Sequence, residues 1–447
     1  MTLLTFPKNF VWGTATASYQ IEGYPLADGA GPSIWHRFSH TPGNIRGGHN
    51  GDLACEHYRR YPEDIALMKS LGIQGYRMST AWTRVLPEGR GRINEAGLDF
   101  YDRLVEALLE AGITPYVTLY HWDLPSDLQD MGGWTNPAMA DWFTEYASIM
   151  FTRLSDRVNN WITLNEPSVV MDRGHVFGQH APGMRDIWAA LRVAHNQLVA
   201  HGRAVRAFRA SGADGEIGIA LNLHPQHAAT NSEEDRACAI RTDAYYNRLF
   251  MDPIFKGEYP AEALDWFGEA WPNIGPGDLD EISTPIDFLG VNYYFPQVVA
   301  HKAGQGALHS EVVRQPAPHT DLGWQISPEG LYDALRSVQT EYGNPKMFIT
   351  ENGAAFDDYP DSDGVVADDA RLDYIRAHLA AAHRAISDGA NLQGYFLWTL
   401  MDNFEWAYGY DVRFGITNVD YTTQKRTVKR SGQWYADAIS RNGVTDA

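Results

Sequence analysis

The feature that most constrains the fold of this chain is a unit that recurs along it: an amphipathic helix, a glycine and a short apolar strand. In residues 95–111, apolar side chains recur at helical spacing on one face. This helix is predicted to end at Gly112, a residue suited to the left-handed backbone that closes helices, and the strand TPYVTLY follows. The same order is found in residues 62–79, where PEDIALMKSL is predicted to be helical up to Gly72.

Strands that alternate with helices in this way indicate a parallel sheet. Asn136 is predicted to cap a further helix, with Pro137 in its first position. Eight strands are predicted, at residues 10–16, 75–79, 114–120, 159–165, 216–223, 287–293, 347–352 and 392–398. Most are apolar on both faces, as strands covered on both sides should be. Eight such strands favour one closed (β/α)8 TIM barrel over a doubly wound sheet.

We expect one catalytic domain over residues 1–447, because no linker divides the chain. Three long polar stretches, 296–330, 354–369 and 402–433, are predicted to be loops at the C-terminal ends of the strands. Length alone would allow more than one domain, but barrels of this class tolerate large loop insertions.

Composition narrows the functional class. With 447 residues, 44% of them hydrophobic, the chain can bury a large core. Its net charge of −20 disfavours nucleic acid and anionic membranes as partners. The N-terminal sequence does not resemble a signal peptide, and no run of 18 apolar residues occurs, so we expect a cytoplasmic protein. Cys55 and Cys238 have no metal-type spacing, although one disulfide between them remains open.

Polar side chains gather where the predicted strands end, which is where barrels of this class carry their chemistry. The residues at these ends, from the first strand to the eighth, are Gln20 and Glu22; Arg77; His121, Trp122 and Asp123; Asn165 and Glu166; Asn292, Tyr293 and Tyr294; Glu351 and Asn352; and Trp398. Glu166 and Glu351 belong to the fourth and seventh strands, so we expect their carboxyls to face each other across the barrel mouth.

Two facing carboxyls suit the hydrolysis of a glycoside. One carboxylic acid protonates the departing oxygen, and the other group attacks the anomeric carbon to form a covalent intermediate. A metal hydrolase is the alternative, with His121, His175 and His180 as conceivable ligands. No HxH or HExxH spacing is present, so no metal is expected. No glycine-rich phosphate loop follows a strand, so no nucleotide cofactor is expected either.

The chain closely resembles family 1 of the glycoside hydrolases, the β-glucosidase family. The resemblance runs from FVWGTATASYQIEG near the start to DNFEWAYGYDVRFGI near the end. TLNEP, residues 163–167, resembles the acid/base motif of the family, and ITENG, residues 349–353, resembles its nucleophile motif. The resemblance implies that Glu166 is the acid/base and Glu351 the nucleophile. It also implies a retaining mechanism, for which the two carboxyls should lie ~5–5.5 Å apart.

The resemblance assigns further roles. Arg77 and Tyr294 would hydrogen-bond Glu351, and Asn292 would be a polar partner near the two carboxylates. Substrate-binding residues implied for the sugar of the non-reducing end are Gln20, His121, Asn165, Trp398, Glu405, Trp406 and Phe414, with Asn165 on the 2-hydroxyl, Trp398 under the ring and Phe414 near C6. The family also often has a non-proline cis peptide at the position of Trp398–Thr399.

Four residues are candidates for the outer site, where the aglycone would bind: Trp122, Val169, His180 and Trp324. Trp122 could line the pocket or pack behind it. His180 could shape the outer site or cap a loop, and Trp324 could stack on the aglycone or serve its own loop. These alternatives remain open at the level of sequence.

The activity implied is that of an exo-acting β-glucosidase on small-molecule β-glucosides, without a cofactor. Glu166 stands where a thioglucosidase of the family would carry Gln, so O-glycosides are expected. Members acting on 6-phosphosugars carry a Ser and a Lys in the loop after the eighth strand, whereas here Glu405 would repel phosphate. A 6-phospho-β-glucosidase, a mainly β-galactosidase or β-fucosidase enzyme, and an inactive sugar-binding barrel are the alternatives. The natural aglycone stays undetermined, and a homo-oligomer is compatible with the sequence.

Overall fold

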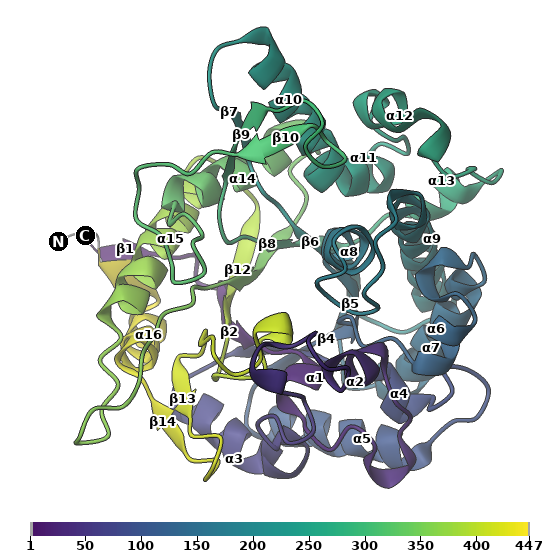
Figure 1. Ribbon diagram of the computed structural model, residues 1–447. Coiled ribbons are helices and arrows are strands. Elements are labelled where there is room, and N and C mark those ends of the chain that lie inside the picture. Colours follow the sequence, from purple (N-terminus) through teal and green to yellow (C-terminus); the bar gives the residue numbers. More distant parts are fainter. Residues whose placement is uncertain (1–2, 446–447) are drawn as a thin grey trace.

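The computed structural model describes residues 3–445, and its centre is a closed barrel of eight parallel strands. In Figure 1 the strands form a ring and helices surround it. The order around the barrel is β11-β12-β2-β3-β4-β5-β6-β8. These strands are β2 (Val11–Ala15), β3 (Gly75–Ser79), β4 (Thr114–Tyr120), β5 (Asn160–Asn165), β6 (Glu216–Asn222), β8 (Phe288–Asn292), β11 (Met347–Asn352) and β12 (Leu392–Trp398). All eight predicted strands and the barrel are confirmed.

Long helices form the outer layer. They are α3 (His57–Ser70), α5 (Glu95–Glu110), α7 (Met139–Leu154), α9 (Ile187–Ser211), α10 (Glu233–Asp243), α14 (Pro328–Glu341), α15 (Asp369–Ser387) and α16 (Arg430–Arg441). Shorter helices lie in the connections: α1 (Ser18–Ile21), α2 (Ile34–Ser39), α4 (Trp82–Val85), α6 (Ser126–Asp130), α8 (Pro167–Met171), α11 (Leu249–Phe255), α12 (Ala261–Phe267) and α13 (Asp278–Ile282). Within the described residues, none of these helices is long and apolar enough to cross a bilayer.

Two predicted helix starts were wrong. α3 begins at His57, so Pro62 lies inside it rather than at its start. Pro62 is exposed, and solvent can therefore hydrate the carbonyl that its missing N–H leaves free. α7 begins at Met139, with Ala138 as its cap residue, and not directly after Asn136. The Asn136 side chain accepts a hydrogen bond from the Ala138 N–H (3.0 Å) and closes the turn before the helix.

Aromatic side chains fill the barrel interior. The ring of Phe396 lies 4.6 Å from that of Tyr116 and 6.3 Å from that of Phe348, between ring centroids. A Cβ on Gly13, in the neighbouring strand, would lie 2.4 Å from the Phe396 ring. Only glycine fits at position 13, because the Phe396 ring lies too close to leave room for a side chain. The barrel interior is therefore a packed core, as is usual for such barrels, and the reactive groups lie at the C-terminal ends of the strands.

Smaller sheets decorate the barrel. β7 (Gln226–Ala228), β9 (Gln297–His301) and β10 (Ser310–Val312) form a three-stranded sheet, which is at the top of Figure 1. β13 (Thr417–Val419) pairs with β14 (Arg426–Val428), and β1 (Leu3–Thr5) pairs with β15 (Gly443–Thr445) near the two ends of the chain. Two of the three long polar stretches predicted as loops, 296–330 and 402–433, thus contain short strands, whereas 354–369 contains none. Cys55 and Cys238 are both free and buried, so the disulfide left open does not form.

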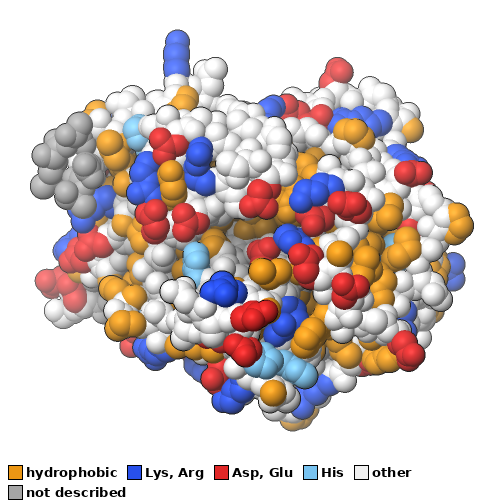
Figure 2. All heavy atoms as spheres, turned by 90° about the horizontal axis from the view of Figure 1, so that it is seen from above, with side chains coloured by type: hydrophobic (Ala, Val, Ile, Leu, Met, Phe, Trp, Pro, Cys, Tyr) orange, Lys and Arg blue, Asp and Glu red, His pale blue; other side chains and the backbone are white. Residues whose placement is uncertain are grey.

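The exterior carries charges of both signs. On the face seen in Figure 2, acidic and basic side chains are interspersed, and hydrophobic side chains are scattered among them. That face presents no broad basic surface of the kind that binds nucleic acid.

A buried cluster of ion pairs ties together the loops that follow β11 and β12. The Lys429 ammonium donates to Asp358 (2.8 Å) and to Asp402 (2.9 Å), and the side chains of Lys429 and Asp402 are fully buried. Arg413 donates to the other oxygen of Asp402 (2.8 Å), and Arg371 donates to Asp358 (2.7 Å). The chain between Asp402 and Arg413 forms one side of the barrel mouth, so this cluster fixes its position.

Replacing Asp402 by alanine should destabilise the protein by about 3–5 kcal/mol, because Lys429 would lose one of its two carboxylate partners while it remains buried. Chemical denaturation monitored by fluorescence measures this free energy of unfolding. Arg430→Ala is the control, since it removes a solvent-exposed ion pair with Asp369 and should cost about 1 kcal/mol or less. Equal losses in the two variants would contradict the role given to Asp402.

Candidate active site

The two glutamates expected at the barrel mouth lie in one cavity. Glu166 directly follows β5 and is 4% exposed, and Glu351 lies in β11 and is 3% exposed. Both line the same cavity, and β6 and β8 lie between their strands around the barrel. Glu166 has a left-handed backbone (φ 46°), and Pro167 begins α8 immediately after it. The chain therefore turns at this point, which places the carboxyl at the strand end.

Glu351 is held by one cation and one hydroxyl. Arg77 donates to its Oε1 (2.5 Å), and the Tyr294 hydroxyl donates to its Oε2 (2.6 Å). Burial raises the pKa of Glu351, while Arg77 and Tyr294 act to lower it. Arg77 and Tyr294 are the two partners of Glu351 that the resemblance implied. They oppose the effect of burial without reversing it, so the pKa of Glu351 stays above its ordinary value.

Glu166 has a different environment. Its Oε1 accepts a hydrogen bond from the Asn292 side chain (2.8 Å). Burial, and then the negative charge of Glu351, raise the pKa of Glu166 well above its ordinary value. Since Arg77 and Tyr294 contact Glu351 directly, Glu351 should be the first of the pair to ionise. One carboxylate and one carboxylic acid in a shared cavity is the state that acid–nucleophile chemistry needs.

Asn165 and Asn292 connect the two carboxyl groups. Asn292 donates to Asn165 (3.0 Å) as well as to Glu166, and Asn165 also accepts from Arg77 (2.6 Å). Asn165 donates to Nε2 of His121 (3.0 Å). An asparagine amide carries two hydrogens, which leaves one for a ligand hydroxyl. Asn165 and Asn292 are fully buried, so their orientations are fixed.

Two further polar atoms are free to bind a ligand. Because Nε2 of His121 accepts from Asn165, its Nδ1 carries the hydrogen, and this Nδ1 is buried with no partner among the described residues. Burial, and then the charge of Arg77, hold the pKa of His121 well below its ordinary value, so the ring is neutral. Gln20 donates to Glu405 (3.2 Å), and its Oε1 has no partner within the described part of the chain.

Aromatic rings line the cavity beside these groups. Trp398, the last residue of β12, is stacked against His121 with ring centroids 5.7 Å apart, and Trp406 packs on Trp122 at 4.6 Å. The Trp398–Thr399 peptide is cis, as the resemblance implied. Flat apolar rings beside hydroxyl-binding groups provide both kinds of contact that a sugar ring makes.

The comparisons with known proteins agree with this geometry. The profile of Glycosyl hydrolase family 1 matches residues 3–444. Beta-glucosidase A of Thermotoga maritima is 53% identical over 448 residues, and the alignment covers 100% of each chain. The chain belongs to glycosyl hydrolase family 1. A solved structure titled family 1 β-glucosidase from T. maritima matches this family 1 chain with a TM-score of 0.98 at 52% identity and covers 100% of both. A bifunctional β-D-glucosidase/β-D-fucosidase of Bifidobacterium breve is 42% identical and covers 98% of this chain and 99% of its own.

The structure brings most of the predicted site residues of this family 1 hydrolase into one cavity. The predicted residues that line it are His121, Trp122, Glu166, Val169, His180, Tyr294, Trp324, Glu351, Trp398, Glu405, Trp406 and Phe414. Gln20, Arg77, Asn165 and Asn292 lie behind the lining and reach it through hydrogen bonds. Trp122 and Trp324 both line the cavity, so the alternative that Trp122 packs behind it is wrong.

Part of the outer wall of the cavity was not predicted from the sequence. The cavity is also lined by Ser168, Asp172, Arg173, Gln179, Asn222, His224, Tyr246, Phe295, Gln297 and Tyr408. Asn222 ends β6, so the strand-end rule that identified Asn292 would have found it. Gln297 begins β9 of the smaller sheet, and the others lie in connections or helices. The placement of all of them depends on tertiary packing, and no local pattern marks them.

Replacing Tyr294 by phenylalanine should move the acid limb of the kcat/KM profile to higher pH. The hydroxyl bond stabilises the ionised form of Glu351, so its loss raises the pKa at which the nucleophile becomes protonated. The profile of kcat/KM against pH with an aryl glycoside measures this shift in the free enzyme, as a property of the coupled pair.

The neighbouring Tyr293→Phe change is a matched control. The Tyr293 hydroxyl donates to the Ser327 carbonyl (2.7 Å) and not to a carboxylate. The positions of both limbs should therefore stay as in the unmodified protein. Superimposable profiles for Tyr294→Phe and the unmodified protein would contradict the assigned role of Tyr294.

Proposed function

We propose that this family 1 hydrolase is an exo-acting retaining β-glucosidase, with Glu351 as nucleophile and Glu166 as acid/base. The observation that carries the proposal is the unequal setting of the two buried carboxyls. Arg77 and Tyr294 bind Glu351, while Glu166 receives a neutral amide hydrogen bond and has the more strongly raised pKa. The names of the T. maritima and B. breve relatives support β-glucosides as substrates.

In the first step the Glu351 carboxylate attacks the anomeric carbon. The bond from that carbon to the leaving oxygen breaks, and the Glu166 proton moves to this oxygen, so that the aglycone departs as an alcohol. The product is a glycosyl ester of Glu351. The Arg77 guanidinium, beside Glu351, keeps the attacking group oriented and compensates the negative charge that it carries before the attack.

In the second step a water molecule attacks the same carbon from the side vacated by the aglycone. Glu166, now ionised, takes a proton from the water, and the bond to Glu351 breaks. The two displacements restore the β configuration and both original protonation states. Because Glu351 becomes neutral in the intermediate, the pKa of Glu166 falls and then rises again when the ester is hydrolysed.

The groups around the pair would hold the glucosyl ring. We assign the free hydrogen of Asn165 to the 2-hydroxyl, and Nδ1–H of His121, Oε1 of Gln20 and the Glu405 carboxyl to the hydroxyls farther from the anomeric carbon. Trp406 would add its indole N–H to this clamp, Trp398 would lie under the ring, and Phe414 would cover C6. The rings of Trp122 and Trp324, with Val169 and His180, would contact the aglycone.

Glu405 bears on the choice between glucosides and 6-phosphoglucosides. Burial, and then the charge of Glu351, raise the pKa of Glu405 to about 8, against the hydrogen bond from Gln20. Near neutral pH the free carboxyl is therefore mostly protonated, and the expected charge repulsion of phosphate is weaker than the sequence suggested. A phosphate on O6 would still lie beside the Glu405 carboxyl and would have no ammonium group as a partner, so we favour the unphosphorylated sugar.

The protein should hydrolyse 4-nitrophenyl β-D-glucoside with a kcat/KM at least on the order of 10²-fold above that for its 6-phosphate, since no charge partner would offset phosphate desolvation. Release of nitrophenolate measures both rates. The β-D-fucoside and β-D-galactoside should be compared in the same assay, and the α-D-glucoside is the negative control. Faster hydrolysis of the 6-phosphate would replace the proposed substrate class, and no hydrolysis of any β-glycoside would indicate a binding protein.

Variants of the two glutamates should give opposite anomers with azide. Glu351→Gly removes the nucleophile, so hydrolysis should fall by several orders of magnitude. Azide can occupy the vacated space and attack an activated aryl glucoside, and the product should be the α-glucosyl azide. In Glu166→Ala, a dinitrophenyl glucoside should still form the glycosyl-enzyme, because its leaving group needs little protonation. Azide should then release the β-glucosyl azide. Proton NMR distinguishes the two products.

The same anomer from both variants would show that the roles of Glu166 and Glu351 are wrongly assigned. Asp172→Asn is a control, since Asp172 is a buried carboxyl that lines the cavity and donates no proton in the proposed steps. That variant should hydrolyse the aryl glucoside without azide. NMR observation of the first anomer released by the unmodified protein tests retention independently, and release of α-glucose first would exclude it.

A further inference from the structure

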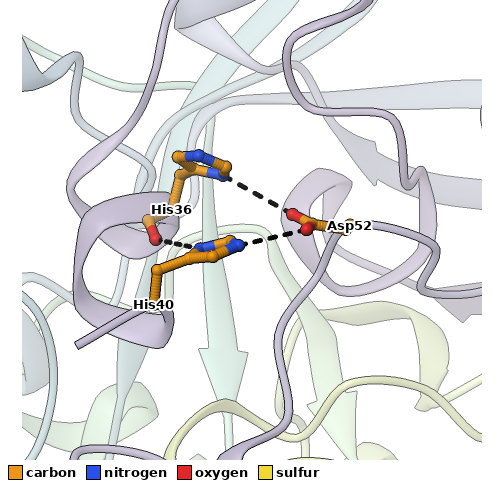
Figure 3. A group of neighbouring side chains, drawn as sticks. All are labelled: His36, His40 and Asp52. Atoms are coloured by element: carbon orange, nitrogen blue, oxygen red, sulfur yellow. Dashed lines mark hydrogen bonds and ion pairs between the residues drawn. The ribbon is translucent and has the colours of Figure 1, made fainter. Parts of the chain in front are cut away.

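A group of three metal-binding side chains lies outside the catalytic cavity. His36 lies in α2 and His40 at its C-terminal end, one helical turn apart, and Asp52 comes from the following loop. Figure 3 shows both imidazole rings directed at the Asp52 carboxylate. Nε2 of His40 lies 3.0 Å from Oδ2 of Asp52, and Nδ1 of His36 lies 3.6 Å from Oδ1. One potential ligand atom from each residue lies within 4.8 Å of the other two.

The hydrogen bonds at His40 determine where its lone pair points. Nδ1 of His40 lies 2.7 Å from the His36 carbonyl oxygen, which can only accept, so Nδ1 carries a hydrogen. In the neutral ring Nε2 then presents a lone pair to the carboxylate of Asp52. Two lone pairs at 3.0 Å repel each other unless a proton or a cation lies between them. An imidazole that donates its other N–H to a backbone carbonyl is the arrangement found in metal ligands.

Two more atoms face the same space without a hydrogen-bond partner. Nδ1 of His36 and Oδ1 of Asp52 are both buried and unpaired among the residues that the structure describes. Their separation of 3.6 Å is too long for a hydrogen bond. Buried polar atoms without partners are costly, so an unpaired nitrogen and an unpaired oxygen facing each other call for a bridging group.

We propose that His36, His40 and Asp52 form a binding site for a divalent transition-metal ion of the zinc type. Bonds of about 2.0–2.1 Å at a tetrahedral centre place ligand atoms about 3.3–3.5 Å apart. Nε2 of His40 lies 3.0 Å from Oδ2 of Asp52 and Nδ1 of His36 lies 3.6 Å from Oδ1, on either side of that spacing, and one ligand atom of each residue lies within 4.8 Å of the other two. Two imidazole nitrogens and one carboxylate suit zinc better than calcium or magnesium, which prefer oxygen ligands alone. The site is open to solvent at His40 and Asp52, whose side chains are 38% and 45% exposed, so water can supply the fourth ligand.

The ion would join two segments that support the catalytic cavity. Trp35 of α2 packs against Trp406 at 4.5 Å between centroids, and Ser39 shares a hydrogen bond with Tyr19 (2.9 Å), whose ring is stacked on Trp406. On the other segment, His49 accepts a hydrogen bond from the Tyr410 N–H (3.1 Å). Bound metal should therefore fix α2 to the loop of Asp52 and stabilise this side of the protein.

Calorimetric titration of the chelator-treated protein with zinc chloride tests the site. The unmodified protein should bind one equivalent of zinc, and His40→Ala and Asp52→Asn should each weaken that binding by more than about 100-fold. Removing even a second-shell partner weakens metal binding by 10–100-fold, so loss of a direct ligand should exceed that range. Zinc should also raise the unfolding temperature of the unmodified protein, and this increase should be absent from both variants.

His301→Ala is the matched control, because it removes an exposed histidine of β9 far from this site in the sequence. Its zinc affinity should equal that of the unmodified protein. No saturable zinc binding by the unmodified protein would overturn the proposal. Zinc binding by His40→Ala and Asp52→Asn as tight as that of the unmodified protein would overturn the proposal as well. The ion would then bind elsewhere, for example at the catalytic carboxyls. Each variant must retain β-glycosidase activity, which confirms that it is folded.

Discussion

The guanidinium of Arg77 is the constraint on which the rest of the site depends. It extends from β3 and donates to Thr118 in β4 (3.2 Å), Asn165 in β5 (2.6 Å) and Glu351 in β11 (2.5 Å). Arg77 is 1% exposed, and its guanidinium lies against the Glu351 carboxylate, the anion that a buried cation needs as a partner. The register of these strands and the position of the Glu351 carboxylate therefore depend on each other, since a shift of β4, β5 or β11 would remove one of the partners of Arg77.

At the barrel mouth, some residues of the site are held in place by the strands and others by contacts between loops. Glu166 and Glu351 are positioned by the strands themselves. Asn292 donates to Glu166 and accepts a hydrogen bond from Thr350, the residue before Glu351. The loop that carries Glu405 and Trp406 extends beyond the end of β12, and the buried ion pairs of Asp402 anchor it. The reacting groups thus belong to the rigid barrel, while the groups assigned to the distal hydroxyls depend on loop contacts.

How much could be predicted from the sequence follows the same division. The spacing of apolar residues and the lengths of the strands predicted the barrel, and the position of a polar residue at a strand end predicted Glu351. These features can be read from short stretches of sequence. The start of α3 was misjudged because Pro62 is tolerated inside the helix where it faces solvent. The two partners of Lys429, Asp358 and Asp402, could not be predicted, since they come from other loops. His36 and His40 show helical spacing in the sequence, but only the fold adds Asp52 as their neighbour.

Closure of the barrel also has a consequence for how the chain reaches this state. β12 pairs in parallel with β2, with Trp398 opposite Ala15, and β15 pairs with β1. The first barrel strand to leave the ribosome, β2, can therefore complete its pairing only when the last, β12, has emerged, and until then two apolar strand edges stay unpaired. Such non-local pairings fold slowly and leave a partly made chain exposed to aggregation. We expect chaperone binding to nascent chains to persist until the segment through β12 has emerged.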